Sequence, residues 1–346
     1  SGSDVGNLSV LGYDPRKYFT GRSPLEAESM GINLGDNDTT FRCNLVNITN
    51  EQSNNFMEDY SAGHIATSKA HKVINFLKNF VDNKEYELYP GVSYRHILVC
   101  KNKTPKIKTT PPHDILDKNI KEFLPTGDDS KDIISIMNKV KVSIENFKIQ
   151  NPQFKTEKLS DIWLWGEGKK TILPSFKELT GYSGSVISAV DLVKGIGKCA
   201  KLNVIDVPGA TGYLDTNYKG KVDASVKSLL NNQFLMLHIE APDETGHEGD
   251  IKKKIKAIED LDSKVLKPLI KGLDLNFSEY RLCIVSDHPT PIELRTHSYE
   301  YVPYLIYQKG INLQNHTFKS FSEKIVENSN NVIHDGHDLI FSLINN

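Results

Sequence analysis

The chain has 346 residues, of which 38% are hydrophobic and 25% are charged, and its 42 basic and 44 acidic residues leave a formal charge of −2. A single hydrophobic core stops growing near about 250–300 residues, so this length predicts two domains or one domain with a large insertion. Because the charges nearly balance, no apolar run reaches roughly 20 residues and the four cysteines are scattered, we expect a cytoplasmic protein that has no disulfide framework and binds neither nucleic acid nor membrane.

The first half of the chain predicts a mixture of strands and amphipathic helices. Turn signals around Gly12 and Gly21 indicate loops at the start, and Pro24 is a favourable first residue for a short helix. The periodicity then predicts strands at 41–48 and 94–99, helices at 24–30, 70–81 and 131–147, and a hinge region at 148–160.

The second half predicts apolar strands that alternate with helices. The expected strands are 185–189, 203–207, 234–239, 282–286 and 302–307, and the expected helices are 190–200, 222–231, 250–273 and 338–344. Continuous apolar strands that alternate with helices are typical of a mostly parallel sheet with helices on both faces. We therefore expect an α/β fold.

Residues of the types that ligate metals follow two of these strands. Asp243 and His247, four residues apart, share one face if their segment is a helical turn. Asp287 and His288 follow another strand directly, and His297 precedes the next. Functional groups collect at the carboxyl ends of parallel strands, so these five side chains are expected to converge.

The chemistry of this set indicates which ions it would hold. Mixed carboxylate and imidazole ligands suit Zn²⁺ or Mn²⁺ better than Mg²⁺ or Ca²⁺. Two carboxylates and three imidazoles exceed what one catalytic ion needs, so a site for two divalent metals fits better, with Mg²⁺ and Co²⁺ left open. Two-metal sites of this kind serve phosphoryl transfer.

Five segments together resemble the archaeal-type 2,3-bisphosphoglycerate-independent phosphoglycerate mutases of the alkaline phosphatase superfamily. They are HIEAPDETGHEGD (238–250), SDHPTPIELRTHS (286–298), the glycine-rich start at 2–27, WLWGEGKKTILPSF (163–176) and the long segment at 184–221. The similarity runs along nearly the whole chain. It implies an alkaline-phosphatase-like domain with a smaller inserted α/β cap domain, and activity without 2,3-bisphosphoglycerate.

The resemblance also implies roles for the metal ligands and for one serine. It assigns Asp243, His247 and His297 to one metal, and Asp287 and His288 to the second metal together with Ser3. Ser3 would be the nucleophile that carries a phosphoryl group between 3-phosphoglycerate and 2-phosphoglycerate. A serine hydroxyl is a weak nucleophile at neutral pH, and a bound dication can hold it as the alkoxide.

The resemblance implies a domain division and a strand upstream of Ser1. We expect a catalytic domain formed by residues 1–35 and 161–346, with a cap at 36–160 that closes over the substrate and excludes water. Members of the family begin with a strand whose aspartate is a further ligand of the second metal, so the printed chain is expected to be part of a longer one.

Residues expected to contact the anionic groups of phosphoglycerate lie in both predicted domains. These are Arg22, Arg95, His96, His113, Asp114, Lys169 and Lys194. Three alternatives to a mutase remain open at this point: a metal-dependent phosphatase or phosphotransferase of the same superfamily, a homoserine-kinase-like enzyme, and a catalytically silent truncated form. The sequence does not indicate an oligomeric state.

Overall fold

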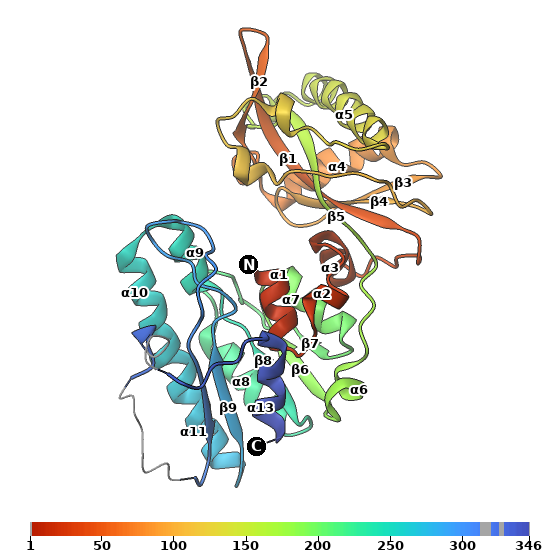
Figure 1. Cartoon of the computed structure of the whole chain (residues 1–346). Coiled ribbons are helices and arrows are strands. Elements are labelled where there is room, and N and C mark those ends of the chain that lie inside the picture. Colours follow the sequence, from red (N-terminus) through yellow and green to blue (C-terminus); the bar gives the residue numbers. More distant parts are fainter. Residues whose placement is uncertain (1, 312–319, 325–328, 346) are drawn as a thin grey trace. The chain divides into compact units, whose positions relative to one another are not determined.

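The chain forms two compact units in the computed structural model, which describes residues 2–311, 320–324 and 329–345 (Figure 1). The first unit comprises residues 1–19 and 172–346, and the second unit comprises residues 20–171. The second unit is therefore inserted in the sequence of the first. None of the described helices is both long enough and apolar enough to span a membrane.

The structure shifts both boundaries that the sequence indicated. Residues 20–35 and 161–171 belong to the second unit, although we expected them in the catalytic domain. The reason is strand pairing, because strand β5 (Asp161–Lys169) pairs along its length with β1 (Thr39–Glu51). Helix α3 (Arg22–Ser29) packs on these two strands.

A five-stranded antiparallel sheet forms the centre of the second unit. Strand β1 pairs with β2, β4 and β5, and β4 pairs with β3. The remaining elements of this unit are β2 (Asn54–Asp59), α4 (Thr67–Val81), β3 (Tyr86–Tyr89), β4 (Arg95–Cys100) and α5 (Ser130–Gln150), with 3₁₀ turns at Pro112–Ile115, Ile120–Phe123 and Pro152–Phe154.

The two faces of this sheet are covered by different helices. Leu98 and Cys100 of β4 join the large core that α4 and α5 complete, whereas Ile97 and Val99 pack with Ala27 of α3. This alternation is the period of two that a pleated strand imposes. Each residue of β4 is therefore assigned to one face by its position.

Two smaller sheets lie in the first unit. Strands β7 (Asn203–Ile205), β6 (Gly184–Ile187) and β8 (Phe234–Leu237) are parallel in that order, and β9 (Arg281–Val285) pairs antiparallel with β10 (Tyr304–Gln308). The helices of this unit are α1 (Ser3–Val10), α2 (Pro15–Tyr18), α6 (Phe176–Thr180), α7 (Asp191–Cys199), α8 (Tyr218–Leu229), α9 (Ala241–Glu248), α10 (Ile251–Asp260), α11 (Lys267–Asn276) and α13 (Leu339–Asn345).

The α/β class is confirmed, but the sheets differ from the expected pattern. Within the described residues, parallel pairing is limited to β7, β6 and β8, and the sheet of the second unit is antiparallel. The apolar side chains of β8 and the residues of β9 are only partly buried. The expected helix at 250–273 is divided into α10 and α11 by a π-helical stretch at Leu261–Leu266.

The elements with strong periodicity are confirmed, and most of the missed ones are short or polar. Helices α3, α4, α5, α7, α8 and α13 and strands β1, β4, β6, β7, β8, β9 and β10 lie within a few residues of the ranges indicated by the sequence. The sequence did not indicate α1, α2, β2, β3, β5 or α6, and it indicated α9 only as a conditional helical turn. A helix of eight residues or fewer offers too few turns to establish a period.

Two isoleucines of α5 test how much of this fold depends on burial. Ile144 is 1% exposed and Ile149 is 71% exposed. We expect Ile144→Ala to lower the free energy of unfolding of the second unit by about 2–5 kcal/mol, because it leaves a cavity. Ile149→Ala is the matched control and should change that free energy by no more than about 0.5 kcal/mol.

Tryptophan fluorescence during urea unfolding measures both variants. The chain has two tryptophans, Trp163 and Trp165, and both lie in β5, so their fluorescence follows the second unit alone. Equal midpoints for the two variants would contradict the assignment of Ile144 to the core.

Candidate active site

Helix α9 places the first two candidate ligands. It begins after Glu240 with Pro242 in its first turn, and it holds Asp243 and His247 one turn apart. The Asp243 Oδ2 and His247 Nε2 atoms are 3.3 Å apart. The structure thus confirms that this spacing lies on a helical turn, with the carboxylate near the helix N-terminus, where the helix dipole favours negative charge.

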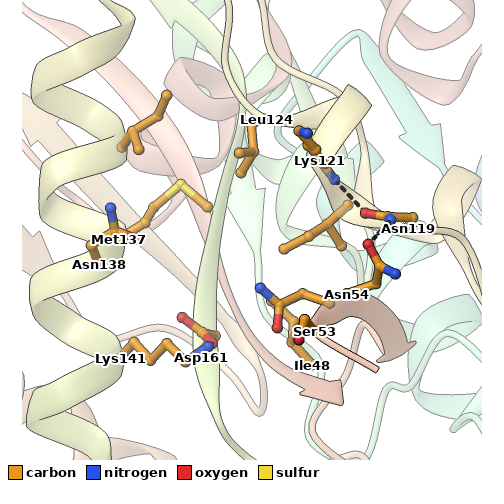
Figure 2. Close-up of a pocket in the computed structure, with 13 residues that line it drawn as sticks. Ile48, Ser53, Asn54, Asn119, Lys121, Leu124, Met137, Asn138, Lys141 and Asp161 are labelled. Carbon is orange, nitrogen blue, oxygen red and sulfur yellow. Dashed lines mark hydrogen bonds and ion pairs between the residues drawn. The ribbon is translucent and has the colours of Figure 1, made fainter. Parts of the chain in front are cut away.

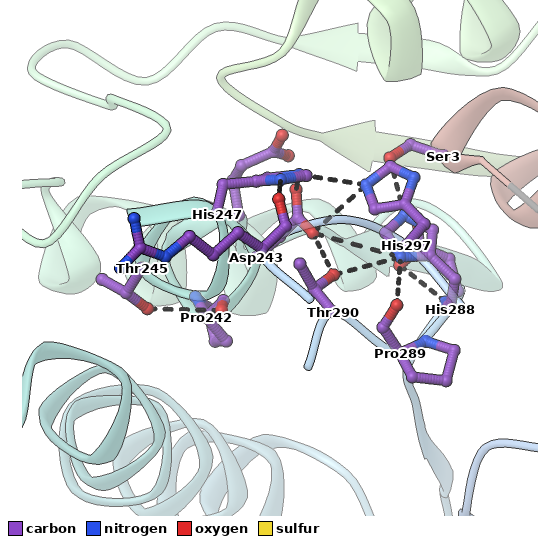
Figure 3. A network of polar contacts seen from close by, with 12 residues as sticks. Ser3, Pro242, Asp243, Thr245, His247, His288, Pro289, Thr290 and His297 are labelled. Carbon is purple, nitrogen blue, oxygen red and sulfur yellow. Dashed lines mark hydrogen bonds and ion pairs between the residues drawn. The ribbon is translucent and has the colours of Figure 1, made fainter. Parts of the chain in front are cut away.

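The loop after β9 completes this group from the other side. His297 Nε2 lies 3.5 Å from Asp243 Oδ1 and 3.1 Å from His247 Nε2. The Thr290 hydroxyl donates a hydrogen bond to Asp243 (Figure 3). The potential ligand atoms of Asp243, His247 and His297 all lie within 4.8 Å of one another, a spacing at which one metal ion could contact all three.

Charge compensation governs the Asp243 carboxylate. Burial opposes its ionisation, but hydrogen bonds from His247, His297 and Thr290 outweigh burial and hold the pKa of Asp243 well below its usual range. In return, the hydrogen bond with Asp243 raises the pKa of His247 to about 9 against the opposing effect of burial. The carboxylate is therefore ionised, as a metal ligand must be.

A second group of candidate ligands adjoins the first. The Ser3 hydroxyl is hydrogen-bonded to His288 Nε2 at 2.9 Å, and the same nitrogen lies 3.4 Å from Asp287 Oδ2. Burial lowers the pKa of His288, which favours the neutral imidazole that ligates metals. The His288 and His297 rings are in contact, with centroids 3.7 Å apart and planes tilted by 34°, so the two groups form one cluster.

Helix α1 brings Ser3 to this cluster through two residues that the sequence analysis did not single out. Asn7 donates 2.8 Å hydrogen bonds to Asp287 Oδ2 and to the Ser3 carbonyl. A Cβ on Gly6 would lie 2.8 Å from the Asp287 Cβ and carbonyl oxygen, so only glycine allows this approach. The Asp4-Val5-Gly6-Asn7 sequence next to a candidate nucleophile was the available signal.

Polar side chains also gather at the ends of β6, β7 and β8. His238 is hydrogen-bonded to Ser188 Oγ at 3.1 Å, and burial lowers its pKa to about 4. Lys221 is 1% exposed and donates to the His238 carbonyl. Lys194, an expected phosphate contact, lies in this region as an ion pair with Asp206 at 2.6 Å.

The comparisons with known proteins decide the family. The sequence model of the 2,3-bisphosphoglycerate-independent phosphoglycerate mutases matches residues 1–150. A probable mutase of this type from Geobacter sulfurreducens is 44% identical over 98% of this chain and 85% of its own length. One from Methanothrix thermoacetophila is 44% identical over 99% of this chain and 86% of its own length. The chain belongs to this family.

Solved structures agree on the fold. A protein from Pyrococcus horikoshii matches with a TM-score of 0.79 at 23% identity, over 100% of this chain and 83% of its own. The cofactor-independent phosphoglycerate mutase of Thermoplasma acidophilum matches with a TM-score of 0.61 at 21% identity, over 100% of this chain and 86% of its own. At these identities the likeness extends to the fold alone.

In this family member, two of the expected substrate contacts lie together in the second unit. Arg22 forms an ion pair with Glu26 at 3.0 Å, and the positive charge of Arg95 also acts on that carboxylate. The sequence analysis missed Arg42. Its Nε atom lies 2.9 Å from Glu26 Oε2, and its guanidinium group lies over the Trp165 ring. Three guanidinium groups around one carboxylate leave an excess of positive charge.

The other expected contacts are dispersed. His96 is 1% exposed and accepts a hydrogen bond from the Gly91 amide through Nδ1, so we correct its assignment to a structural one, because a buried ring cannot reach a dissolved substrate. His113 packs edge-on against Trp165, and its Nε2 atom lies 3.7 Å from Asp114 Oδ1. Lys169 is exposed at the end of β5.

The close approach at Gly6 gives a test of how α1 is held. We expect Gly6→Ala to destabilise the first unit by about 1–3 kcal/mol, because the added methyl group would overlap Asp287. Amide hydrogen exchange of residues 4–10 should become faster. Ser9→Ala, on the same helix, is the control and should leave both quantities nearly unchanged. Unaltered exchange in Gly6→Ala would show that α1 is not packed against Asp287.

Proposed function

We propose that this chain interconverts 3-phosphoglycerate and 2-phosphoglycerate, without 2,3-bisphosphoglycerate, through a phosphoserine formed on Ser3. The observation that carries the proposal is the position of the Ser3 hydroxyl, 2.9 Å from His288 Nε2 at the edge of the ligand cluster. Relatives at 44% identity carry the mutase name. The cluster supplies the donor types that a phosphoryl-transferring metal site requires.

The donor set fits two divalent metals. Asp243, His247 and His297 would hold one ion, and Asp287, His288 and Ser3 would contribute to the second. Mixed carboxylate and imidazole donors suit Mn²⁺ or Zn²⁺, with Mg²⁺ and Co²⁺ also open. A dication bound beside Ser3 supplies the positive charge that stabilises its alkoxide at neutral pH.

The chain's own residues then perform the transfer. The Ser3 oxygen attacks phosphorus in line, so that a bond from Ser3 to phosphorus forms as the bond to the substrate oxygen breaks. Glycerate turns, and its other hydroxyl receives the phosphoryl group from Ser3, which returns to its starting state. Asn7 keeps Asp287 oriented throughout by its hydrogen bond.

The division of labour between the units belongs to the same proposal. The first unit is the alkaline-phosphatase-like catalytic domain, and the second is the substrate-binding cap. Positive charge around Glu26 supports anion binding by Arg22 and Arg95. The remaining proposed contacts with phosphoglycerate are His113, Asp114, Lys169 and Lys194.

Replacement of the nucleophile tests the reaction. We expect Ser3→Ala to lower kcat for the interconversion, assayed with Mn²⁺, by at least about a thousandfold, because the variant lacks the hydroxyl that is proposed to carry the phosphoryl group. Mass spectrometry of acid-quenched wild-type protein should find phosphate on Ser3. Ser9→Ala is the control and should retain activity. Undiminished activity of Ser3→Ala would exclude Ser3, and release of free phosphate without isomer formation would indicate a phosphatase.

The Thr290 hydroxyl provides a test of the metal centre. Thr290 donates to Asp243 and lies 3.3 Å from His288 Nδ1. We expect Thr290→Val to weaken Mn²⁺ binding about 10–100-fold, because a ligand loses the partner that orients it. Titration calorimetry measures the affinity. Thr245→Val is the matched control, because among the described residues the Thr245 hydroxyl bonds only to backbone carbonyls of its own helix. Equal Mn²⁺ affinity of the two variants would contradict the role of Thr290.

A further inference from the structure

A cavity of about 200 Å³ lies within the second unit, separate from the residues discussed so far. One wall is formed by α5 and the start of β5, and the facing wall by the turn before β2 and the 3₁₀ turn at Ile120–Phe123 (Figure 2). All of these elements belong to the second unit, so the shape of the cavity depends on that unit alone.

The lining divides into an apolar part and a charged part. Ile48, Ile120, Leu124 and Met137 supply an apolar surface. Asp161 and Lys141 lie next to each other on the α5 side, and Asn119 and Lys121 lie across from them (Figure 2). Cavities that bind small molecules combine a mainly apolar lining with a few convergent polar groups in this way.

Asp161 is the unusual member of this lining. It is 5% exposed, and its only ion-pair partner among the described residues is Lys141, at 3.8 Å. That separation exceeds a hydrogen bond, and no residue in the described part of the chain donates one to the carboxylate. Burial raises the pKa of Asp161 to about 7, opposed by Lys141 and assisted by Glu145. A largely buried carboxylate that accepts no hydrogen bond from these residues can accept one from a ligand that carries a donor.

We propose that this cavity binds a small zwitterionic α-amino acid with an aliphatic side chain. Its ammonium group donates to Asp161, its carboxylate pairs with Lys141, and its side chain packs on Ile120, Leu124 and Met137. The proposal does not depend on the proposed function of the first unit.

The paired charges select a zwitterion over singly charged ligands. A simple amine would place its positive charge beside Lys141, and a simple carboxylate would place its negative charge beside Asp161. With Lys141 Nζ and Asp161 Oδ2 only 3.8 Å apart, a ligand that bears an ammonium group and a carboxylate on one carbon satisfies both side chains without such repulsion. The cavity volume is sufficient for a ligand of the size of valine or leucine.

A matched set of probes tests the proposal on the whole chain. L-leucine carries both charges, isopentylamine keeps the ammonium group alone, and 4-methylpentanoate keeps the carboxylate alone. Binding is measured by titration calorimetry and by the fluorescence of Trp163 and Trp165, which lie in the same strand as Asp161. We expect saturable binding of L-leucine near about 1 mM, as its few atoms allow, and at least about tenfold weaker binding of each singly charged probe.

Two variants and a control connect binding to the cavity. Asp161→Asn should weaken L-leucine binding at least about tenfold, because it removes the charge that faces the ammonium group. Met137→Trp should abolish binding by filling the cavity. Asp128→Asn, at an exposed position of the same unit, is the control and should bind L-leucine normally. Urea unfolding followed by tryptophan fluorescence confirms that each variant is folded. If Asp161→Asn is not folded, the affinity of Met137→Trp for L-leucine decides the test.

The proposal is overturned if L-leucine, L-valine and L-alanine all fail to bind saturably. It is also overturned if isopentylamine binds as tightly as L-leucine, or if folded Met137→Trp retains the wild-type affinity.

Discussion

The half-buried Asp243 carboxylate is the constraint on which the candidate active site depends. A charge at this depth is stable only with donors around it, and here the donors come from different segments. His247 is supplied by the same helix, whereas Thr290 and His297 are supplied by the loop after β9. These contacts therefore hold that loop against α9. Lys254 of α10 also donates a hydrogen bond to the Thr290 carbonyl. The same loop carries the second group of ligands, so both groups are positioned together.

The sequence could predict the part of this site that is encoded locally. Asp243 and His247 are one helical turn apart after β8, and Asp287 follows β9, so spacing alone places each of them just beyond the end of a strand. Asn7 and Thr290 could not be found in this way. They are uncharged, their types are common on surfaces, and the Asn7 contact with Asp287 joins residues 280 apart in the chain. Pairings of that separation are set by tertiary packing, which no short-range pattern encodes.

The alternation of side chains along a strand explains why Arg95 and His96, which are neighbours in β4, lie in different surroundings. Arg95 and His96 were assigned to one function, but adjacent residues of a strand point to opposite faces. His96 shares its face with Leu98 and Cys100 and is buried towards α4 and α5. Arg95 remains within electrostatic reach of Glu26 on α3, as does Arg42 of the paired strand β1. The face to which a strand residue points says something about its role only when the strand and the elements that cover each face are known. Here both faces of β4 are covered, so the sequence does not separate Arg95 from His96.

The glycines of β5 help to explain why the sequence analysis did not indicate this strand. Glycine weakens a strand pattern, yet β5 contains Gly166 and Gly168 and still pairs with β1 as far as Lys169. A Cβ on Gly168 would lie 2.7 Å from the Thr20 carbonyl, so this glycine permits close backbone approach rather than motion. The approach brings together the two places where the chain enters and leaves the second unit, and the Thr20 and Thr171 hydroxyls are hydrogen-bonded there at 3.0 Å. The insertion is therefore closed by contacts within the second unit itself.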